Sequence, residues 1–147
     1  MYKRFCILFL LLAVFFSGNV PTVGDKIIEF SMQHLKKKVD TGECWDLANA
    51  ALNYANAKWT SPFGFGTKIN TSQIKRADIL QFTNIKIKFT NGSISFPKHT
   101  AIIYKANKDR VTLIHQNFNN KRYVDTISLN LSDVKSGTVD AYRPVGN

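Results

Sequence analysis

The sequence predicts a single α+β domain in which an antiparallel sheet packs on a helix. Its 147 residues suit one domain and are too few for two of ordinary size. Apolar residues recur at helical spacing in the first part of the chain, whereas short runs with period-two alternation fill the second part. Helices followed by a succession of strands are typical of α+β folds.

The first 18 residues have the pattern of a secretory leader. Lys3 and Arg4 precede an apolar run from Phe5 to Phe16, and small or turn-forming residues follow. The run is shorter than the roughly 20 residues that a membrane-spanning helix needs. We therefore expect residues 1–18 to be a signal peptide, residues 19–147 to form the domain, and the protein to be secreted or extracytoplasmic, in the periplasm or at the cell surface. Membrane contact is expected only through an uncleaved leader.

The domain is strongly basic. The formal net charge of the chain is +10, and removal of Lys3 and Arg4 with the leader leaves +8. Such a charge attracts anionic cell-surface polymers without selecting among them, although it also serves solubility. No nucleic-acid recognition motif accompanies it, so nucleic acid is not an expected partner.

Two helices are predicted after the leader. The first follows Ile27, Ile28, Ser31, Leu35 and Val39, and is expected to close at Lys36 to Lys38, where cations complement a helix C-terminus. The second carries an apolar stripe that begins at Cys44 and ends at Ala55. Its start is expected within Thr41 to Glu43, with Thr41 as the N-cap.

The remainder is predicted to be a loop and then a meander of strands. Glycines, a proline and two aromatics between Trp59 and about Ile74 indicate the loop. The predicted strands are Asp78 to Phe82, Ile85 to Phe89, Thr100 to Tyr104, Val111 to His115, Val124 to Leu131 and Val139 to Tyr142.

Cys44 is the first candidate for chemistry. Cys6 lies in the leader, so Cys44 is the single cysteine of the expected mature chain. An unpaired thiol in an exported protein indicates chemistry or intermolecular pairing, unless it is a buried and inert residue. The first turn of a helix favours a thiolate, and its free N–H groups can stabilise an oxyanion.

His99 and His115 are the candidate bases. They bracket a predicted hairpin that turns through Ala106 to Asp109. An odd number of loop residues would place His99, His115 and Asn117 on one face, whereas an even number would set Gln116 opposite His99. Either arrangement puts a polar side chain beside His99, as a cysteine–histidine–polar triad requires. One cysteine and two histidines without a metal-binding spacing favour neither a metal site nor a cofactor.

Five motifs occur in an order that resembles papain-like cysteine amidohydrolases. They are Gly42-Glu-Cys-Trp-Asp-Leu-Ala, Ala77-Asp-Ile-Leu-Gln-Phe, His99-Thr-Ala-Ile-Ile, Leu113-Ile-His-Gln-Asn and Ala141-Tyr-Arg-Pro. The nearest branches are CHAP domains, NlpC-type cell-wall peptidases and a cysteine-proteinase-like domain of fungal actin-patch proteins. The resemblance implies a papain-like fold with N-terminal helices, the nucleophile at a helix N-terminus, and a meandering antiparallel sheet.

The resemblance also implies roles for single residues. Cys44 is the nucleophile and His99 the general base, with His115 preferred and Asn117 second as the residue that orients His99. Ala77 stands where the family usually has Gly, and Asp78 is expected to be a turn residue that starts a strand.

Aromatic residues near these motifs are candidates for a substrate cleft. They are Trp45, Trp59, Phe63 and Phe65, with Phe63 and Phe65 preferred because they lie between glycines in a loop. Core packing is the ordinary role of such side chains.

The predicted function is that of a secreted cysteine peptidase or amidase. It cleaves amide bonds through a thioester acyl-enzyme, with peptidoglycan or a peptide as substrate. Two alternatives stay open: a catalytically idle papain-like module that binds a cell-wall, glycan or protein partner, and an acyltransferase that uses the same thioester.

Overall fold

The computed structural model describes residues 20–147, so the predicted leader lies outside the described residues. The elements, in chain order, are α1 (Val23–Gln33), α2 (Cys44–Tyr54), β1 (Ala57–Lys58), β2 (Thr67–Ile69), β3 (Ile79–Phe89), β4 (Gly92–Asn107), β5 (Arg110–His115), β6 (Asp125–Asn130), β7 (Val134–Arg143) and β8 (Val145–Gly146), with 3-10 turns at Thr71–Gln73 and Leu131–Asp133.

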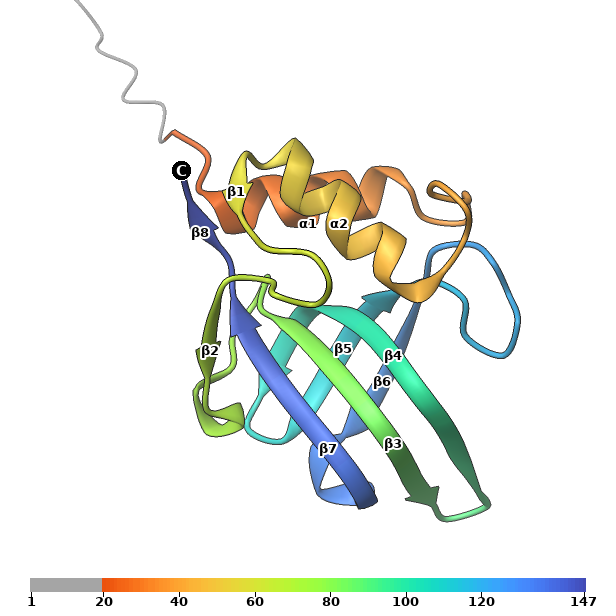
Figure 1. Ribbon diagram of the computed structural model, residues 1–147. Coiled ribbons are helices and arrows are strands. Elements are labelled where there is room, and N and C mark those ends of the chain that lie inside the picture. Colours follow the sequence, from red (N-terminus) through yellow and green to blue (C-terminus); the bar gives the residue numbers. More distant parts are fainter. Residues whose placement is uncertain (1–19) are drawn as a thin grey trace, which may run out of the picture.

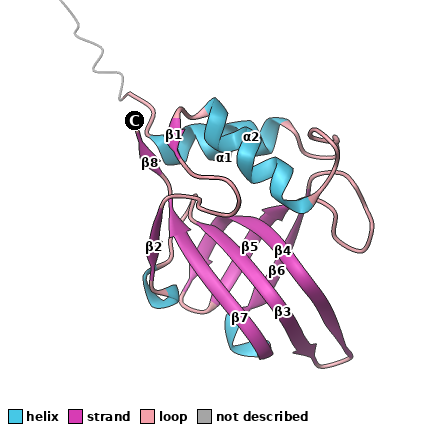
Figure 2. Ribbon diagram, in the orientation of Figure 1, coloured by secondary structure: helices cyan, strands magenta, loops and turns pink. Residues whose placement is uncertain are grey.

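The described part of the chain is α+β, as predicted. Six antiparallel strands pair in the order β2-β7-β3-β4-β5-β6, and β1 pairs with β8 in a small separate ladder. Both helices lie together above one end of the large sheet (Figures 1 and 2). The strands run down from the helices, and α2 contacts β4.

The first helix is shorter than the sequence predicts. Thr22 and Asp25 form a reciprocal capping box at its start, and the helix ends at Gln33. Lys36 has a φ of 62°, which is incompatible with a continuing α-helix. The prediction that Lys36 to Lys38 close the helix is therefore wrong. They belong to a segment that pairs with Val124, through Lys36 N–H to Val124 O (2.8 Å) and Val124 N–H to Lys37 O (2.8 Å).

The second helix begins at Cys44, just after the predicted Thr41 to Glu43, and Glu43 rather than Thr41 is its N-cap. The Thr41 hydroxyl donates instead to the Asp46 carboxylate at 2.6 Å, and the Glu43 N–H donates to the same carboxylate at 2.9 Å. These bonds hold the approach to α2 and so fix the direction of its first turn.

The strands are longer and more continuous than predicted. Two predicted strands merge into β3, which bends at Asn84 (φ 50°), where its register with β7 shifts. β4 begins at Gly92, eight residues earlier than the predicted Thr100. β2 lies within the segment that was predicted to be a loop.

A β-bulge decides the register of the histidine strands. The turn between β4 and β5 has an even length, Lys108 and Asp109, and its register, continued along both strands, would set Phe118 opposite His99. The pairing then shifts by one residue between Ile103 and Lys105, so that Ala101 lies opposite His115. The bulge thus restores the odd register, in which His99 and His115 point to the same face.

In the part of the chain that the structure describes, buried hydrophobic side chains form two groups, one on each face of the sheet. The first lies between the helices and the sheet and includes Leu47, Leu52 and Ile102. The second fills the inside of the curled sheet and includes Phe82, Ala101 and Leu113. Successive residues of β4 therefore face different environments.

Candidate active site

Cys44 is half-buried at the first position of α2. Burial raises the pKa of its thiol, the Glu43 carboxylate raises it further, and hydrogen bonds from the backbone and hydroxyl of Thr100 oppose the rise. The expected stabilisation of a thiolate at a helix N-terminus is thus outweighed by desolvation. In the resting site Cys44 is a neutral thiol packed against the residue that follows His99.

Two amides after β5 hold the start of α2. Buried Gln116 accepts from Val39 N–H (2.8 Å) and donates to Val39 O (3.0 Å) and Glu43 O (2.9 Å). Asn117 donates from Nδ2 to the Glu43 carboxylate at 2.9 Å. The role of Gln116 in holding α2 was not predicted, although a polar residue at the end of a buried strand was the available signal.

His99 and His115 meet inside the curled sheet. His99 Nε2 and His115 Nδ1 are 3.0 Å apart, and both residues are buried. Two phenylalanines wall the pair: the Phe96 ring centroid is 5.2 Å from that of His99, and the Phe118 centroid is 4.9 Å from that of His115. The structure therefore brings together the predicted base and the preferred orienting residue.

This apolar surrounding keeps both imidazoles neutral at neutral pH. Burial, and then the charge of His115, lowers the pKa of His99 to about 3. Burial lowers the pKa of His115 to about 4, with the Asp125 carboxylate opposing the shift. A neutral imidazole has one donor and one acceptor nitrogen, so one histidine donates to the other.

Asn117, the second candidate to orient His99, is bonded elsewhere. Its amide donates to Glu43, its φ is 59°, and its Oδ1 is buried with no hydrogen-bond partner among residues 20–147. The structure thus places His115 beside His99, and Asn117 beside the N-cap of α2.

Cys44 reaches the sheet at the residue that follows His99. Thr100 hydrogen-bonds Cys44, and His99, one residue earlier, lies against the Phe96 ring. No hydrogen bond joins Cys44 to His99 within residues 20–147. The nitrogen of His99 that is not engaged with His115 is Nδ1, and it is the atom available to a thiol.

The aromatic candidates differ in exposure. Trp45 is 40% exposed beside Cys44, and Phe63 is half-buried with Lys98 Nζ 5.0 Å from its ring centroid. Phe65 has 0% exposure and packs edge-on against Tyr142. The prediction that Phe65 lines a cleft is therefore corrected to a core role, while Trp45 and Phe63 remain accessible.

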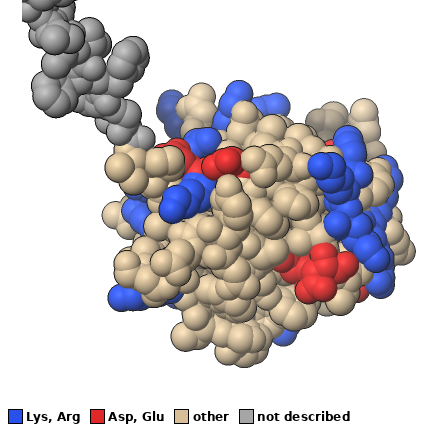
Figure 3. All heavy atoms as spheres, turned by 90° about the horizontal axis from the view of Figure 1, so that it is seen from above, with Lys and Arg blue, Asp and Glu red and all other residues tan. Residues whose placement is uncertain are grey.

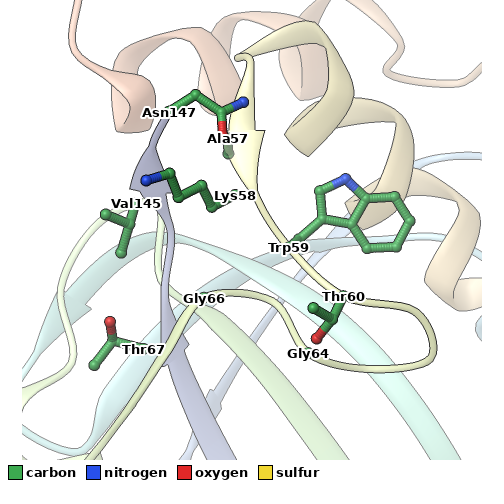
Figure 4. Close-up of a pocket in the computed structure, with 9 residues that line it drawn as sticks. All are labelled: Ala57, Lys58, Trp59, Thr60, Gly64, Gly66, Thr67, Val145 and Asn147. Carbon is green, nitrogen blue, oxygen red and sulfur yellow. The ribbon is translucent and has the colours of Figure 1, made fainter.

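Trp59 lines an open pocket of about 600 Å³ at the β1–β8 ladder. Figure 4 shows the pocket, with Trp59 and Lys58 on opposite sides of the chain at β1. Its lining residues are Ala57, Lys58, Trp59, Thr60, Gly64, Gly66, Thr67, Val145 and Asn147. None of the predicted catalytic residues is among them.

Basic side chains gather near the start of α2. A Cβ added to Gly42 would lie 3.0 Å from the Arg122 Cβ and 3.1 Å from the Lys38 Cδ, so both side chains border the turn before Cys44. Arg122 also pairs with Glu43 at 3.0 Å. Viewed from above the helices, Lys and Arg collect along one edge of this face (Figure 3).

Asp78, which directly precedes β3, forms a buried ion pair with Arg143. Its buried carboxylate accepts two hydrogen bonds from Arg143, at 3.0 and 2.9 Å, and one from Lys75 N–H at 2.8 Å. The ion pair joins the second and last of the five sequence motifs. Ala77, where the resembling family usually has Gly, has a φ of 72°, a backbone conformation that glycine adopts readily.

Two further features of residues 20–147 bear on chemistry. This part of the chain contains no group of three His, Cys, Asp or Glu side chains placed to hold a metal ion. Neither of its α-helices has the length and apolar character needed to cross a membrane.

Comparison with known proteins places this geometry in a family. A family model described as the AIM3/BBC1 cysteine proteinase-fold domain matches residues 19–147. The chain belongs to this family. The AIM3/BBC1 match supports the predicted papain-like superfamily, while a closer relation to CHAP or NlpC-type domains stays a prediction.

A curated relative is Altered inheritance of mitochondria protein 3 of Debaryomyces hansenii, which is 28% identical over 88% of this chain. The match covers only 18% of that relative, so this AIM3/BBC1 domain corresponds to less than a fifth of its length.

Two solved structures share the fold. The crystal structure of Ly7917 superposes with a TM-score of 0.59 and 17% identity over 84% of this chain and 62% of that one. Ly7917 with the hydrolyzing product of MDP gives a TM-score of 0.56 and 16% identity over 82% and 63%.

Proposed function

We propose that this AIM3/BBC1 domain is a cysteine hydrolase that cleaves amide bonds, with Cys44 as nucleophile, His99 as general base and His115 as the residue that orients His99. The observation that carries the proposal is the 3.0 Å contact of His99 Nε2 with His115 Nδ1, one residue from the Thr100 contact of Cys44. This arrangement leaves His99 Nδ1 free for the thiol proton.

The reaction proceeds in two halves. His99 Nδ1 takes the proton of Cys44 as Sγ bonds to the substrate carbonyl carbon, and the amide C–N bond then breaks as His99 returns the proton to the leaving nitrogen. Water attacks the thioester, again with His99 accepting its proton, and the acid leaves as Cys44 regains its hydrogen. Backbone N–H groups in the first turn of α2 are the donors for the developing oxyanion.

The electrostatics of the resting site support a general-base mechanism rather than a preformed ion pair. Burial raises the pKa of Cys44 and lowers the pKa of His99 to about 3, so thiol and imidazole are both neutral. His115, with a pKa of about 4, stays neutral and can accept from His99 Nε2–H. Contacts in a resting active site are often looser than in the reacting complex, which is consistent with the absence of a Cys44–His99 hydrogen bond in the described residues.

The substrate class that we propose is a peptide, including the peptide part of peptidoglycan if the protein is exported. Trp45 and Phe63 supply accessible apolar surface near the catalytic residues, and Lys98 over Phe63 adds a cation. These features suit a substrate with both apolar and acidic groups.

The test is product formation. The chain is incubated with peptidoglycan fragments and a peptide library, and new termini are identified by mass spectrometry, with Cys44→Ala and His99→Gln as matched variants. We expect products from the parent chain and a loss of about 100-fold or more in each variant. Products that persist unchanged in Cys44→Ala would show that another group does the chemistry.

A second candidate function is binding without turnover. The raised pKa of Cys44 and the basic edge near Gly42 favour it, because an anionic cell-wall or glycan partner needs charge and no nucleophile. Sedimentation with peptidoglycan that weakens with salt and survives both Cys44→Ala and His99→Gln, without any product, is the result that distinguishes this function. Transfer of the acyl group to an amine instead of water would appear in the same mass spectra as a ligated product.

A further inference from the structure

Asp125 stands directly behind His115 in the sheet. The two residues are paired across β5 and β6, and side chains of directly paired antiparallel residues lie on one face. His115 uses Nδ1 toward His99, so Nε2 is the nitrogen that remains for groups on the β6 side.

A small cavity of about 90 Å³ joins the two side chains. It is lined by His115, Phe118, Asn119, Lys121, Tyr123, Asp125, Thr126 and Ile127. The cavity has room for a water molecule, and its polar wall offers the partners that a bridging water needs. Asp125 is the one carboxylate in this lining.

The Asp125 carboxylate is held in place from outside the sheet. Its Oδ1 accepts from Lys36 Nζ at 2.5 Å and from the Thr126 N–H at 2.9 Å. Lys36 comes from the segment after α1, which two backbone hydrogen bonds tie to Val124, next to Asp125. These donors lower the pKa of Asp125, so the carboxylate is charged at neutral pH.

We propose that Asp125 is a positioning residue that fixes His115 in the tautomer with the proton on Nε2. A carboxylate on the Nε2 side favours an N–H there, which leaves Nδ1 as an acceptor. His99 then donates from Nε2, and its Nδ1 becomes the base for Cys44. The inference rests on the proposed cysteine hydrolase function, and it extends the polar chain from Cys44 through both histidines to β6.

Other charged groups around His115 do not supply the same bias. Lys121 and Tyr123 line the same cavity from the segment between β5 and β6, and the Lys121 cation opposes an N–H directed toward it. Glu43, at the start of α2, is engaged by Asn117 and Arg122. Asp125 is therefore the group whose removal changes the tautomer.

The test is ¹⁵N NMR of labelled histidine side chains at neutral pH. In the parent chain we expect both His99 and His115 to carry the proton on Nε2. Asp125→Asn is expected to give a mixture of tautomers at both residues. The control is Asp140→Asn, because Asp140 pairs with Lys68 at 2.8 Å and its side chain is 34% exposed, against 33% for Asp125. Unchanged tautomers in Asp125→Asn would overturn the proposal.

A second variant keeps the test decisive if Asp125→Asn does not fold. Lys36→Met removes the cation that competes for the carboxylate, so the pKa of His115 is expected to rise, with the Nε2 tautomer kept. The matched control is Lys68→Met, which should leave His115 unaffected. A purely structural role for the Lys36–Asp125 pair predicts lower stability and an unchanged pKa of His115, and that outcome contradicts the proposal.

Activity separates this inference from the proposed function. If the domain hydrolyses peptides, Asp125→Asn should reduce kcat about tenfold or more with little change in KM, because Asp125 does not touch the substrate. If the tautomers depend on Asp125 but no peptide is cleaved, the positioning role stands and the hydrolase function fails. If peptides are cleaved but the tautomers do not change in Asp125→Asn, the hydrolase function stands and the positioning role fails.

Discussion

The buried histidines predict a loss of stability in acid. Both have the ordinary pKa of 6.5 when unfolded but about 3 and about 4 when folded. As pH falls below 6.5, the unfolded chain binds protons that the folded chain does not bind, so the free energy of unfolding drops until the folded pKa values are reached. We expect a loss of about 2 kcal/mol per histidine between pH 6.5 and 5. Urea unfolding across this range checks it, and His115→Gln should make the profile less steep. An equally steep profile in that variant would contradict the assignment.

The types of His99 and His115, with Cys44 near a helix start, were enough to predict a cysteine–histidine–polar arrangement. Which polar residue lies beside His99 depends on a hydrogen bond that sequence spacing does not fix, and the structure places His115 there at 3.0 Å. Thr100 and Asp125 were not predicted, because their positions beside Cys44 and His115 depend on how other elements pair and pack.

Glu43 gives a prediction for the reactivity of Cys44. Its carboxylate contributes to the raised pKa of the thiol, so Glu43→Gln should lower that pKa and speed alkylation by iodoacetamide at neutral pH. Arg122→Met is the matched opposite, because it removes the cation 3.0 Å from Glu43 and should slow the reaction. Rates that move in the same direction in both variants would show that charge is not the cause.

For helices and strands, the spacing of apolar residues predicted the type of each element well. It predicted poorly the residues at which each element begins and ends. The start of α2 was predicted to within a few residues because the apolar stripe begins at Cys44, but Thr41 was wrongly taken as the N-cap. The end of α1 was not, because Lys36 to Lys38 follow a helical pattern but pair with Val124. Likewise the bulge between β4 and β5 has no marker in the sequence, although it decides which face His99 occupies.

The Asp78–Arg143 pair is expected to hold β3 to β7. Breaking a buried pair leaves a charge without its partner, so Asp78→Ala should cost about 3 kcal/mol, with the one-third exposure of Arg143 limiting the loss. Lys68→Met breaks the exposed Lys68–Asp140 pair and should cost less than about 1 kcal/mol. Urea unfolding of both variants measures the difference, and equal losses would mean that burial of Asp78 is irrelevant.

On the scale of the whole domain, the two buried groups of side chains support different parts of the candidate site. The group under the helices positions α2, whereas the group inside the curled sheet supports the histidines. The sequence predicted a sheet packed on a helix, but not that the sheet curls around a second core, because alternation within a strand does not reveal curvature.

Shortening one buried side chain in each group tests whether the two groups have separate roles. Leu52→Ala in the first group and Ile87→Ala in the second should each cost about 2–5 kcal/mol, because both side chains are fully buried. Leu52→Ala should also change the alkylation rate of Cys44, since it loosens α2 on the sheet, whereas Ile87→Ala should not. If the two variants lose similar stability and change the alkylation rate of Cys44 equally, the first group has no separate role in positioning α2.

The proposed function requires that Cys44 is a nucleophile activated by His99. The decisive measurement is the rate at which a peptidyl electrophile modifies Cys44, read as intact mass in a Cys6→Ser background. We expect one adduct per chain, formed faster than on free cysteine and slowed about 100-fold or more by His99→Gln. A rate equal to that of free cysteine, or one indifferent to His99→Gln, would contradict it.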